Sequence, residues 1–170
     1  MTVQVIDNFL KEEEIQTIVD KTIYDWNFPL YYNDVKVNPK KSSAGDHDYQ
    51  FTHLFYMNES ASSQYIEVIQ PVLDRLNFGS LVKIKLNLQL KYTSIEEFDL
   101  HNDLGEDYGH AKSAVFYLND NNGYTRFENG ERIISKRNRM VIFDQSLKHT
   151  GSTCTDAKFR AVLNINFYEK

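Results

Sequence analysis

The segment FDLHND, residues 98–103, places a histidine and an aspartate two positions apart at the end of a stretch that is typical of a β-strand. Side chains at positions i and i+2 of a strand point to the same side. His101 and Asp103 can therefore reach one metal ion if they lie at a strand end, through an imidazole nitrogen and a carboxylate oxygen. A third ligand has to come from elsewhere in the chain.

Four other histidines are candidates for the third ligand: His47, His53, His110 and His149. His149 follows the apolar run MVIFD and precedes TGS, so we expect it at a strand end, as we do His101. Two histidines and one carboxylate on one face leave three coordination positions open, which is the arrangement of non-haem Fe(II) oxygenases. We interpret the remaining three histidines as loop, structural or surface residues.

Arg160 follows His149 by eleven residues and opens the apolar segment AVLNINF. A buried guanidinium needs an anionic partner, and this segment contains no Asp or Glu before Glu169. A small dicarboxylate would supply that partner through a bidentate contact. The sequence thus predicts an anion site in addition to the metal site.

The elements that position these residues change in kind along the chain. Residues 7–26 and 62–77 have apolar residues at helical spacing, and Pro71 is expected to kink or break the second helix. Residues 31–56 between them are typical of a long loop or loose hairpin that covers a site. From residue 81 apolar and polar residues alternate, and four further strand-like runs follow.

Helices followed by a series of short strands predict an α+β, mostly β fold, in which a helical layer packs on an antiparallel β-sandwich or barrel. The length predicts a single domain over residues 1–170. We expect residues 1–78 to be mainly helical support and the covering loop, and residues 79–170 to form the β core.

Strand periodicity predicts which side chains face the interior. If Arg160 points inward, the inward set on its strand also contains Val162, Asn164 and Asn166, and the outward set is Ala161, Leu163, Ile165 and Phe167. On the strand within residues 111–120 the inward set is Ser113, Val115, Tyr117 and Asn119, and the outward set is Ala114, Phe116 and Leu118. Because both outward sets are apolar, we expect the N-terminal helices to cover them and the interior to be polar.

Composition limits the partners and the compartment. The net charge of −5 counts against a nucleic-acid-binding protein, and we interpret the basic run at residues 136–139 as a solvated hairpin turn. Cys154 is the only cysteine, so no internal disulfide can form and a cytoplasmic location is expected. The N-terminal residues have neither the pattern of a signal peptide nor that of a membrane span.

The segment His101-Asn102-Asp103, followed by His149 and Arg160, resembles the HxD…H…R pattern of the Fe(II)- and 2-oxoglutarate-dependent dioxygenases. It looks most like their prolyl 4-hydroxylase-like branch, which includes small phage and bacterial members. The resemblance covers residues 81–168 and, more loosely, VIDNFLKEEE near the N-terminus, and NGYTRFENGERI resembles the Gly-x-Thr-x-Phe hairpin of the family. Phe98 departs from the family, since many prolyl hydroxylases have a second tyrosine there, and Arg160 stands where the collagen-type enzymes use lysine.

The resemblance implies a double-stranded β-helix, or jelly roll, with N-terminal helices on the outer face of the major sheet. It implies Fe(II) as the metal, 2-oxoglutarate as cosubstrate and O₂ as oxidant, with ascorbate as an optional reductant. The implied metal ligands are His101, Asp103 and His149, and the implied cosubstrate contacts are Arg160, Tyr117 and Tyr92.

The implied reaction is a hydroxylation coupled to decarboxylation of 2-oxoglutarate to succinate. The branch implies a prolyl residue in a peptide or protein as substrate, with free proline or another small molecule as the alternative, and residues 31–56 and 104–112 as the walls of the site. Two other functions stay open: an AlkB-type nucleic-acid demethylase, against which the acidic balance counts, and a non-catalytic, metal-binding cupin-like module, which would not need Arg160 in its interior. We expect no nucleic-acid or membrane partner and leave the oligomeric state open; the compartment would be the host cytoplasm if the chain is phage-encoded.

Overall fold

The structure is a computed structural model that describes residues 3–34 and 49–170. Its elements in chain order are β1 (Gln4–Asp7), α1 (Glu12–Thr22), β2 (Tyr31–Asn33), β3 (Gln50–Met57), β4 (Ser60–Ala61), the 3₁₀ helix η2 (Ile66–Ile69), α2 (Gln70–Arg75), β5 (Phe78–Leu90), the 3₁₀ helix η3 (Glu106–Tyr108), β6 (Lys112–Tyr117), β7 (Tyr124–Phe127), β8 (Arg132–Ile134), β9 (Arg139–Asp144), β10 (His149–Gly151) and β11 (Phe159–Glu169).

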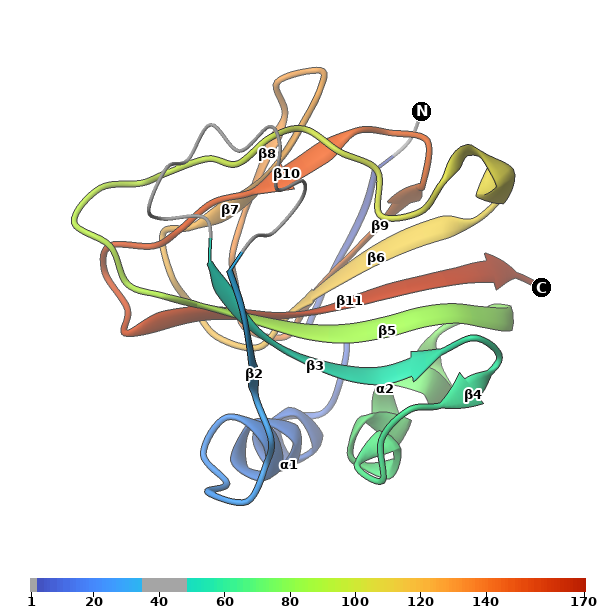
Figure 1. The fold of residues 1–170 in the computed structure, drawn as a ribbon, viewed down its shortest axis with the longest axis horizontal. Helices are drawn as coiled ribbons and strands as arrows, with labels where there is room; N and C mark the ends of the chain where they lie inside the picture. Colours follow the sequence, from blue (N-terminus) through green and yellow to red (C-terminus); the bar gives the residue numbers. More distant parts are fainter. Residues whose placement is uncertain (1–2, 35–48) are drawn as a thin grey trace.

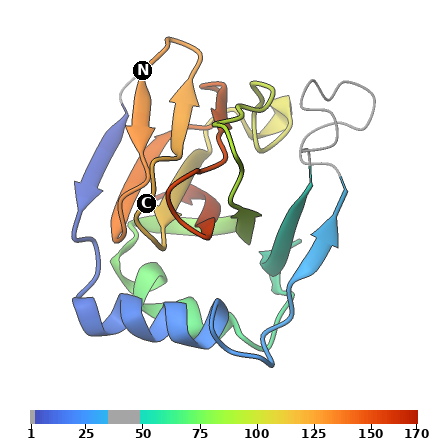
Figure 2. The same ribbon diagram turned by 90° about the vertical axis from the view of Figure 1, so that its left-hand side faces the viewer.

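Two antiparallel sheets make up the β core. The main sheet has eight strands in the order β1-β9-β6-β11-β5-β3-β2, with β4 beside β3, and the smaller sheet has the order β10-β7-β8. Single bridges from Glu97 to Ser152 and from His101 to His149 lay the segment 97–101 along the free edge of β10. Figures 1 and 2 show α1 and α2 on one side of the main sheet and the smaller sheet on the other. This is the jelly roll with an outer helical layer that the sequence resemblance implied.

The predicted parity of β6 and β11 is confirmed. The outward residues of both strands lie in one buried apolar cluster with Ile15, Ile18 and Val72 of the two helices. The inward residues Val115, Tyr117 and Val162 belong to a second cluster between the sheets, which also contains Val141 and Phe143 of β9 and Phe127 of the opposite sheet. The helices therefore cover the apolar outer face of the main sheet, and the polar inward residues are left to line the interior.

The N-terminal third contains more strands than its sequence predicts. Residues 4–7 form the edge strand β1 against β9, and helix α1 starts only at Glu12, where the Lys11 backbone N–H donates to the Glu14 carboxylate at 2.8 Å. β2 and β3 are the stems of the expected loose hairpin, and β3 pairs with β5 inside the main sheet. Residues 1–78 therefore contain, besides the expected helical support and covering loop, the strands β1 and β4.

The second expected helix is broken, as Pro71 predicts. The 3₁₀ helix η2 ends at Ile69, and α2 begins at Gln70 with the proline in its first turn. Proline is well tolerated there because the first N–H groups of a helix have no partner within the helix. None of the helices among the described residues is long and apolar enough to cross a membrane.

The basic run at residues 136–139 is a turn, as predicted, but it is not simply solvated. Asn138 has a left-handed backbone, with φ of 65°, and its buried amide bonds both the N–H and the carbonyl of Leu10 at 2.8 Å. Arg137 pairs with Glu12, and Lys136 and Arg139 pair with Asp7 at 3.0 and 2.6 Å. The turn therefore fixes the segment between β1 and α1 to the main sheet.

Candidate active site

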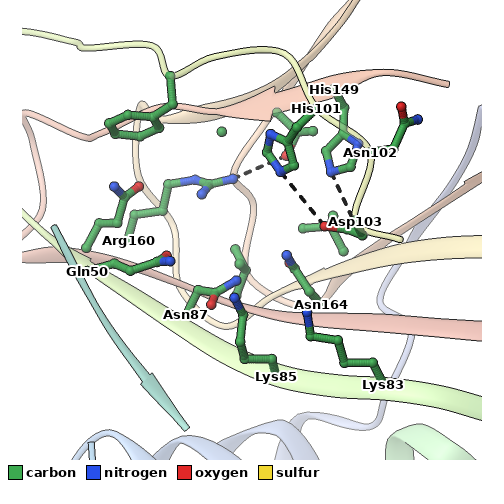
Figure 3. Close-up of a pocket in the computed structure, with 16 residues that line it drawn as sticks. Gln50, Lys83, Lys85, Asn87, His101, Asn102, Asp103, His149, Arg160 and Asn164 are labelled. Carbon is green, nitrogen blue, oxygen red and sulfur yellow. Dashed lines mark hydrogen bonds and ion pairs between the residues drawn. The ribbon is translucent and has the colours of Figure 1, made fainter. Parts of the chain in front are cut away.

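Three side chains that the sequence separates by up to 48 positions meet between the two sheets. His101, Asp103 and His149 offer ligand atoms that all lie within 4.8 Å of one another, and they are the group of this kind found among the described residues. The Nε2 atoms of His101 and His149 lie 3.9 and 3.7 Å from the two oxygens of the Asp103 carboxylate. Figure 3 shows both imidazole rings directed at Asp103.

Backbone pairing brings the two histidines together. His101 and His149 exchange both backbone N–H···O=C bonds at 3.0 Å, so they stand directly opposite each other on adjacent extended segments. The Thr150 hydroxyl donates to the Phe98 carbonyl at 2.9 Å and holds the same two segments in register. Asn102 donates to the Gln145 carbonyl at 2.7 Å, which fixes the start of the turn that carries Asp103.

The donor set fits a divalent cation. The Nδ1 of His101 lies 2.9 Å from the Asp99 carbonyl oxygen and must carry the proton there, which leaves the lone pair of Nε2 facing Asp103. Burial lowers the pKa of His149 and favours its neutral form. Burial works to raise the pKa of Asp103, but His149, His101 and an Asn166 N–H bond at 3.2 Å outweigh it and hold the pKa below its usual value. Two imidazoles and a carboxylate that converge in this way are the donors that Fe(II) binds.

Arg160 is buried beside this cluster without an acidic partner. Its Nε donates to the Ser135 hydroxyl at 2.9 Å and its Nη2 to the Thr125 hydroxyl at 3.2 Å. Among the described residues no carboxylate forms an ion pair with it, although only 5% of its surface is exposed. Burial lowers the pKa of the guanidinium, which nevertheless stays protonated as arginine does in proteins. A buried cation that has only neutral partners is suited to bind an anion.

Two glycines leave the space that Arg160 occupies. A Cβ on Gly123 would lie 2.8 Å from the Arg160 Cδ and 2.7 Å from the Thr153 carbonyl oxygen. A Cβ on Gly151 would lie 3.2 Å from Nη1 of the same guanidinium. The absence of side chains at these positions therefore sets the path of Arg160 toward the cavity.

A cavity of about 270 Å³ joins the two sites. Its lining residues come from both sheets: Gln50, Lys83, Lys85, Asn87, Gln89, Phe98, His101, Asn102, Asp103, Val115, Thr125, His149, Gly151, Arg160, Val162 and Asn164. In Figure 3 Arg160 extends from one end of this space toward His101. The volume is close to the lower end of the range for small-molecule sites, and most of the named side chains are polar.

The polar side of β5 faces this cavity, which the sequence did not reveal. Lys83, Lys85, Asn87 and Gln89 line it, while the alternate residues Ile84, Leu86 and Leu88 are buried under the helices. Alternation alone cannot say whether a polar side faces solvent or a wet interior. The inward position predicted for Arg160 was the one available signal. Gln89 stands opposite Arg160 in the pairing of β5 with β11, so the polar side of β5 faces the same way as Arg160.

The two predicted tyrosine contacts stay predictions. Tyr117 is fully buried and lies behind the cavity: its hydroxyl donates to Thr125 at 2.8 Å, and its ring centre is 5.6 Å from the Arg160 guanidinium carbon. Burial raises the pKa of its hydroxyl. Tyr92 packs beside Tyr49, with ring centres 6.2 Å apart, and is not among the cavity-lining residues.

The remaining histidines behave as interpreted where they are described. Both ring nitrogens of His53 have partners at 2.7 Å, the Pro29 carbonyl and the Ser63 hydroxyl, so it is a satisfied structural residue. His110 is exposed. His47 and the middle of the covering loop lie outside the described residues.

Solved structures share this architecture. A member of the 2OG-Fe(II) oxygenase family from Burkholderia pseudomallei matches with a TM-score of 0.69 at 12% identity, over 97% of this chain and 84% of that one. The chain has the fold of the 2OG-Fe(II) oxygenases. A prolyl hydroxylase from Trichoplax adhaerens, solved with a peptide of the hypoxia inducible factor, matches with a TM-score of 0.67 at 14% identity, over 97% of this chain and 83% of that one.

A prolyl-4-hydroxylase from Pseudomonas putida matches with a TM-score of 0.61 at 16% identity, over 99% of this chain and 92% of that one. No protein-family model matches the sequence, and none of the curated proteins matches it. The likeness therefore lies in the fold, and the activity has to be argued from the site.

Proposed function

We propose that this chain is a hydroxylase that depends on Fe(II) and 2-oxoglutarate and acts, like the prolyl hydroxylases, on a prolyl residue. His101, Asp103 and His149 would hold the metal, and residues 1–170 would act as one domain. The observation that carries the proposal is that this ligand set and Arg160, a buried cation without an acidic partner among the described residues, line a single cavity. A metal site alone would not need a second, cationic site within the same space.

The residues of the chain would divide the work of binding and positioning. Arg160 would grip the distal carboxylate of 2-oxoglutarate, with the Thr125 and Ser135 hydroxyls holding the guanidinium in place. Tyr117 would support Thr125 from behind, and Tyr92 would contact the cosubstrate if its ring turns toward the cavity. When bound, the metal and its cosubstrate supply the oxidative chemistry, and the protein orients the reactants and excludes water.

The two alternatives explain less of the cavity. A metal-binding cupin-like module would not require Arg160 to be buried without an acidic partner. An AlkB-type demethylase needs a basic groove along a nucleic acid, whereas the chain is acidic overall, with a net charge of −5. The likeness in fold to the two prolyl hydroxylases supports a peptide or protein substrate, and a free amino acid is the second candidate.

An oxygen-free titration of Arg160→Met tests the proposal. The variant should bind Fe(II) as the wild type does, because the three ligands are untouched. Its affinity for 2-oxoglutarate should fall about tenfold to a hundredfold, the worth of a hydrogen-bonded charge. The visible charge-transfer band of the chelated cosubstrate reports binding. Arg75→Met, on the outer helix α2, is the matched control and should bind Fe(II) and 2-oxoglutarate as the wild type does. Unchanged 2-oxoglutarate affinity in Arg160→Met would refute the assignment.

A further inference from the structure

Two lysines line the cavity on the metal side. Lys83 and Lys85 are both half-buried residues of β5. The pairing of β5 with β11 sets Lys85 opposite Asn164 and Lys83 opposite Asn166, and Asn166 donates to Asp103 at 3.2 Å. Figure 3 shows both lysine side chains rising from β5 toward the side of the cavity where Asp103 lies.

Arg160 occupies a different part of the same strand pair. It stands opposite Gln89, and Gln89 lies six positions after Lys83 on β5. At about 3.3 Å per residue of strand, the backbone positions of these two residues are roughly 20 Å apart. The lysine pair is thus displaced from Arg160 toward the far end of the cavity, where the metal ligands are.

Asp103 attracts both lysines, but neither forms a close ion pair with a carboxylate of the described residues, as other partly buried cations do. Lys112 pairs with Asp144 at 2.6 Å, and Arg126 pairs with Glu97 at 2.7 Å. Burial, followed by repulsion from Lys83, lowers the pKa of Lys85 to about 8, and attraction to Asp103 opposes this shift only in part. Two like charges placed together at the edge of an interior cost free energy unless an anion binds between them.

The charges of a loaded site leave this pair unmatched. The cavity lining contains three cationic side chains, Lys83, Lys85 and Arg160, and one carboxylate, Asp103. Fe(II) and the 2-oxoglutarate dianion would cancel each other, and Asp103, which attracts both lysines, would offset one of the three cations. A net excess of two positive charges remains in the lining of the cavity. The molecule that enters next to the metal is therefore favoured if it is anionic.

We propose that Lys83 and Lys85 form an anion-binding subsite for the substrate, so that the substrate carries a carboxylate close to the carbon that is hydroxylated. This inference rests on the proposed function and adds the substrate class to it. Two sources supply the same chemistry: an acidic side chain next to the target proline in a peptide, or the α-carboxylate of a free amino acid.

Binding without turnover tests the subsite. Wild-type protein is loaded with Fe(II) and 2-oxoglutarate under argon, and the charge-transfer band is recorded. Dissociation constants are then measured by calorimetry for two probe pairs: acetyl-Glu-Pro-Glu-amide against acetyl-Gln-Pro-Gln-amide, and L-proline against L-prolinamide. The first pair tests the peptide source and the second tests the free amino acid.

At least one carboxylate probe should bind about tenfold or more tightly than its amide counterpart, as expected for a charge-assisted contact. The double variant Lys83→Gln/Lys85→Gln should lose that preference and keep its affinity for 2-oxoglutarate. Lys91→Gln/Lys158→Gln, at two exposed lysines outside the cavity, removes the same charge and should behave as the wild type. If the double variant does not fold, the two single variants replace it.

Three results would overturn the inference. In protein that forms the charge-transfer band, the first is equal binding of the charged and neutral probes, and the second is no binding of either carboxylate probe. A variant that folds, as circular dichroism reports, but loses 2-oxoglutarate would assign the lysines to the cosubstrate instead. Failure of the wild type to form the band refutes the proposed function itself, and the two failures are therefore distinguishable.

Discussion

Replacing Gly123 with alanine should damage the fold and the anion site together. The new Cβ would lie 2.7 Å from the Thr153 carbonyl oxygen and 2.8 Å from both the Arg160 Cδ and the Asn121 Oδ1. These separations are roughly 0.6–0.7 Å short of ordinary van der Waals contact. The carbonyl belongs to the backbone and cannot turn away, so the strain falls on the guanidinium side chain and on the loop.

The cost follows from this crowding. Overpacking of a filled interior typically destabilises a protein by about 1–3 kcal/mol, and urea unfolding of the metal-free protein measures it. Displacement of Arg160 should also weaken 2-oxoglutarate about tenfold, the loss expected when a charge-assisted contact is misaligned. The charge-transfer titration measures that affinity in the same variant.

Two other glycines provide graded controls. A Cβ on Gly105 would meet nothing within 4 Å, so Gly105→Ala should leave both properties unchanged. A Cβ on Gly151 would meet only the end of the Arg160 side chain, at 3.2 Å, so Gly151→Ala should weaken 2-oxoglutarate with a smaller loss of stability. If Gly123→Ala matched Gly105→Ala in both assays, the account of how Arg160 is positioned would be wrong.

Three further changes test the fold and the support of the site. Hydrogen bonds from Arg139 and Lys136 hold the pKa of Asp7 below its usual range, so these ion pairs stabilise the fold above about pH 4 and their contribution is lost as the pH falls. Asp7→Asn should therefore flatten the acid side of a plot of unfolding free energy against pH. An unchanged slope would contradict this. Leu163→Ala should cost about 2–5 kcal/mol in urea unfolding while Fe(II) binding persists, since it opens a cavity beneath the helices and not at the site. Tyr117→Phe removes the donor to the Thr125 hydroxyl, so 2-oxoglutarate affinity should fall about fivefold, and an affinity equal to that of the wild type would place the tyrosine outside the cosubstrate site.

The sequence predicts the β core well because its signal is local. Alternation along β6 and β11 states which side chains share a face, and turn residues mark where strands end. The meeting of His101 with His149 follows from the same reasoning, since both lie at strand ends in a pattern that a family resemblance supports. The alternation and the turns need only neighbours in the chain, whereas the meeting of the two histidines, which are distant in the chain, also needed the resemblance.

The features that the sequence did not reveal depend on distant partners. Strand β1 is four residues long and is extended because it pairs with β9 and because Asn138 binds Leu10. The polar face of β5 resembles a solvent-exposed face until the smaller sheet is placed over it. Lys83 and Lys85 were therefore invisible as site residues, although their positions on one face of the strand were predicted.

We propose that the segment around His101 is half of an iron site at which 2-oxoglutarate chelates the metal. The most direct measurement is the visible absorption spectrum of the metal-free protein after Fe(II) and 2-oxoglutarate are added without oxygen. We expect a charge-transfer band in the wild type that is absent from His101→Ala. Binding of Fe(II) without the band would leave the metal site standing and contradict the assignment as a 2-oxoglutarate-dependent hydroxylase.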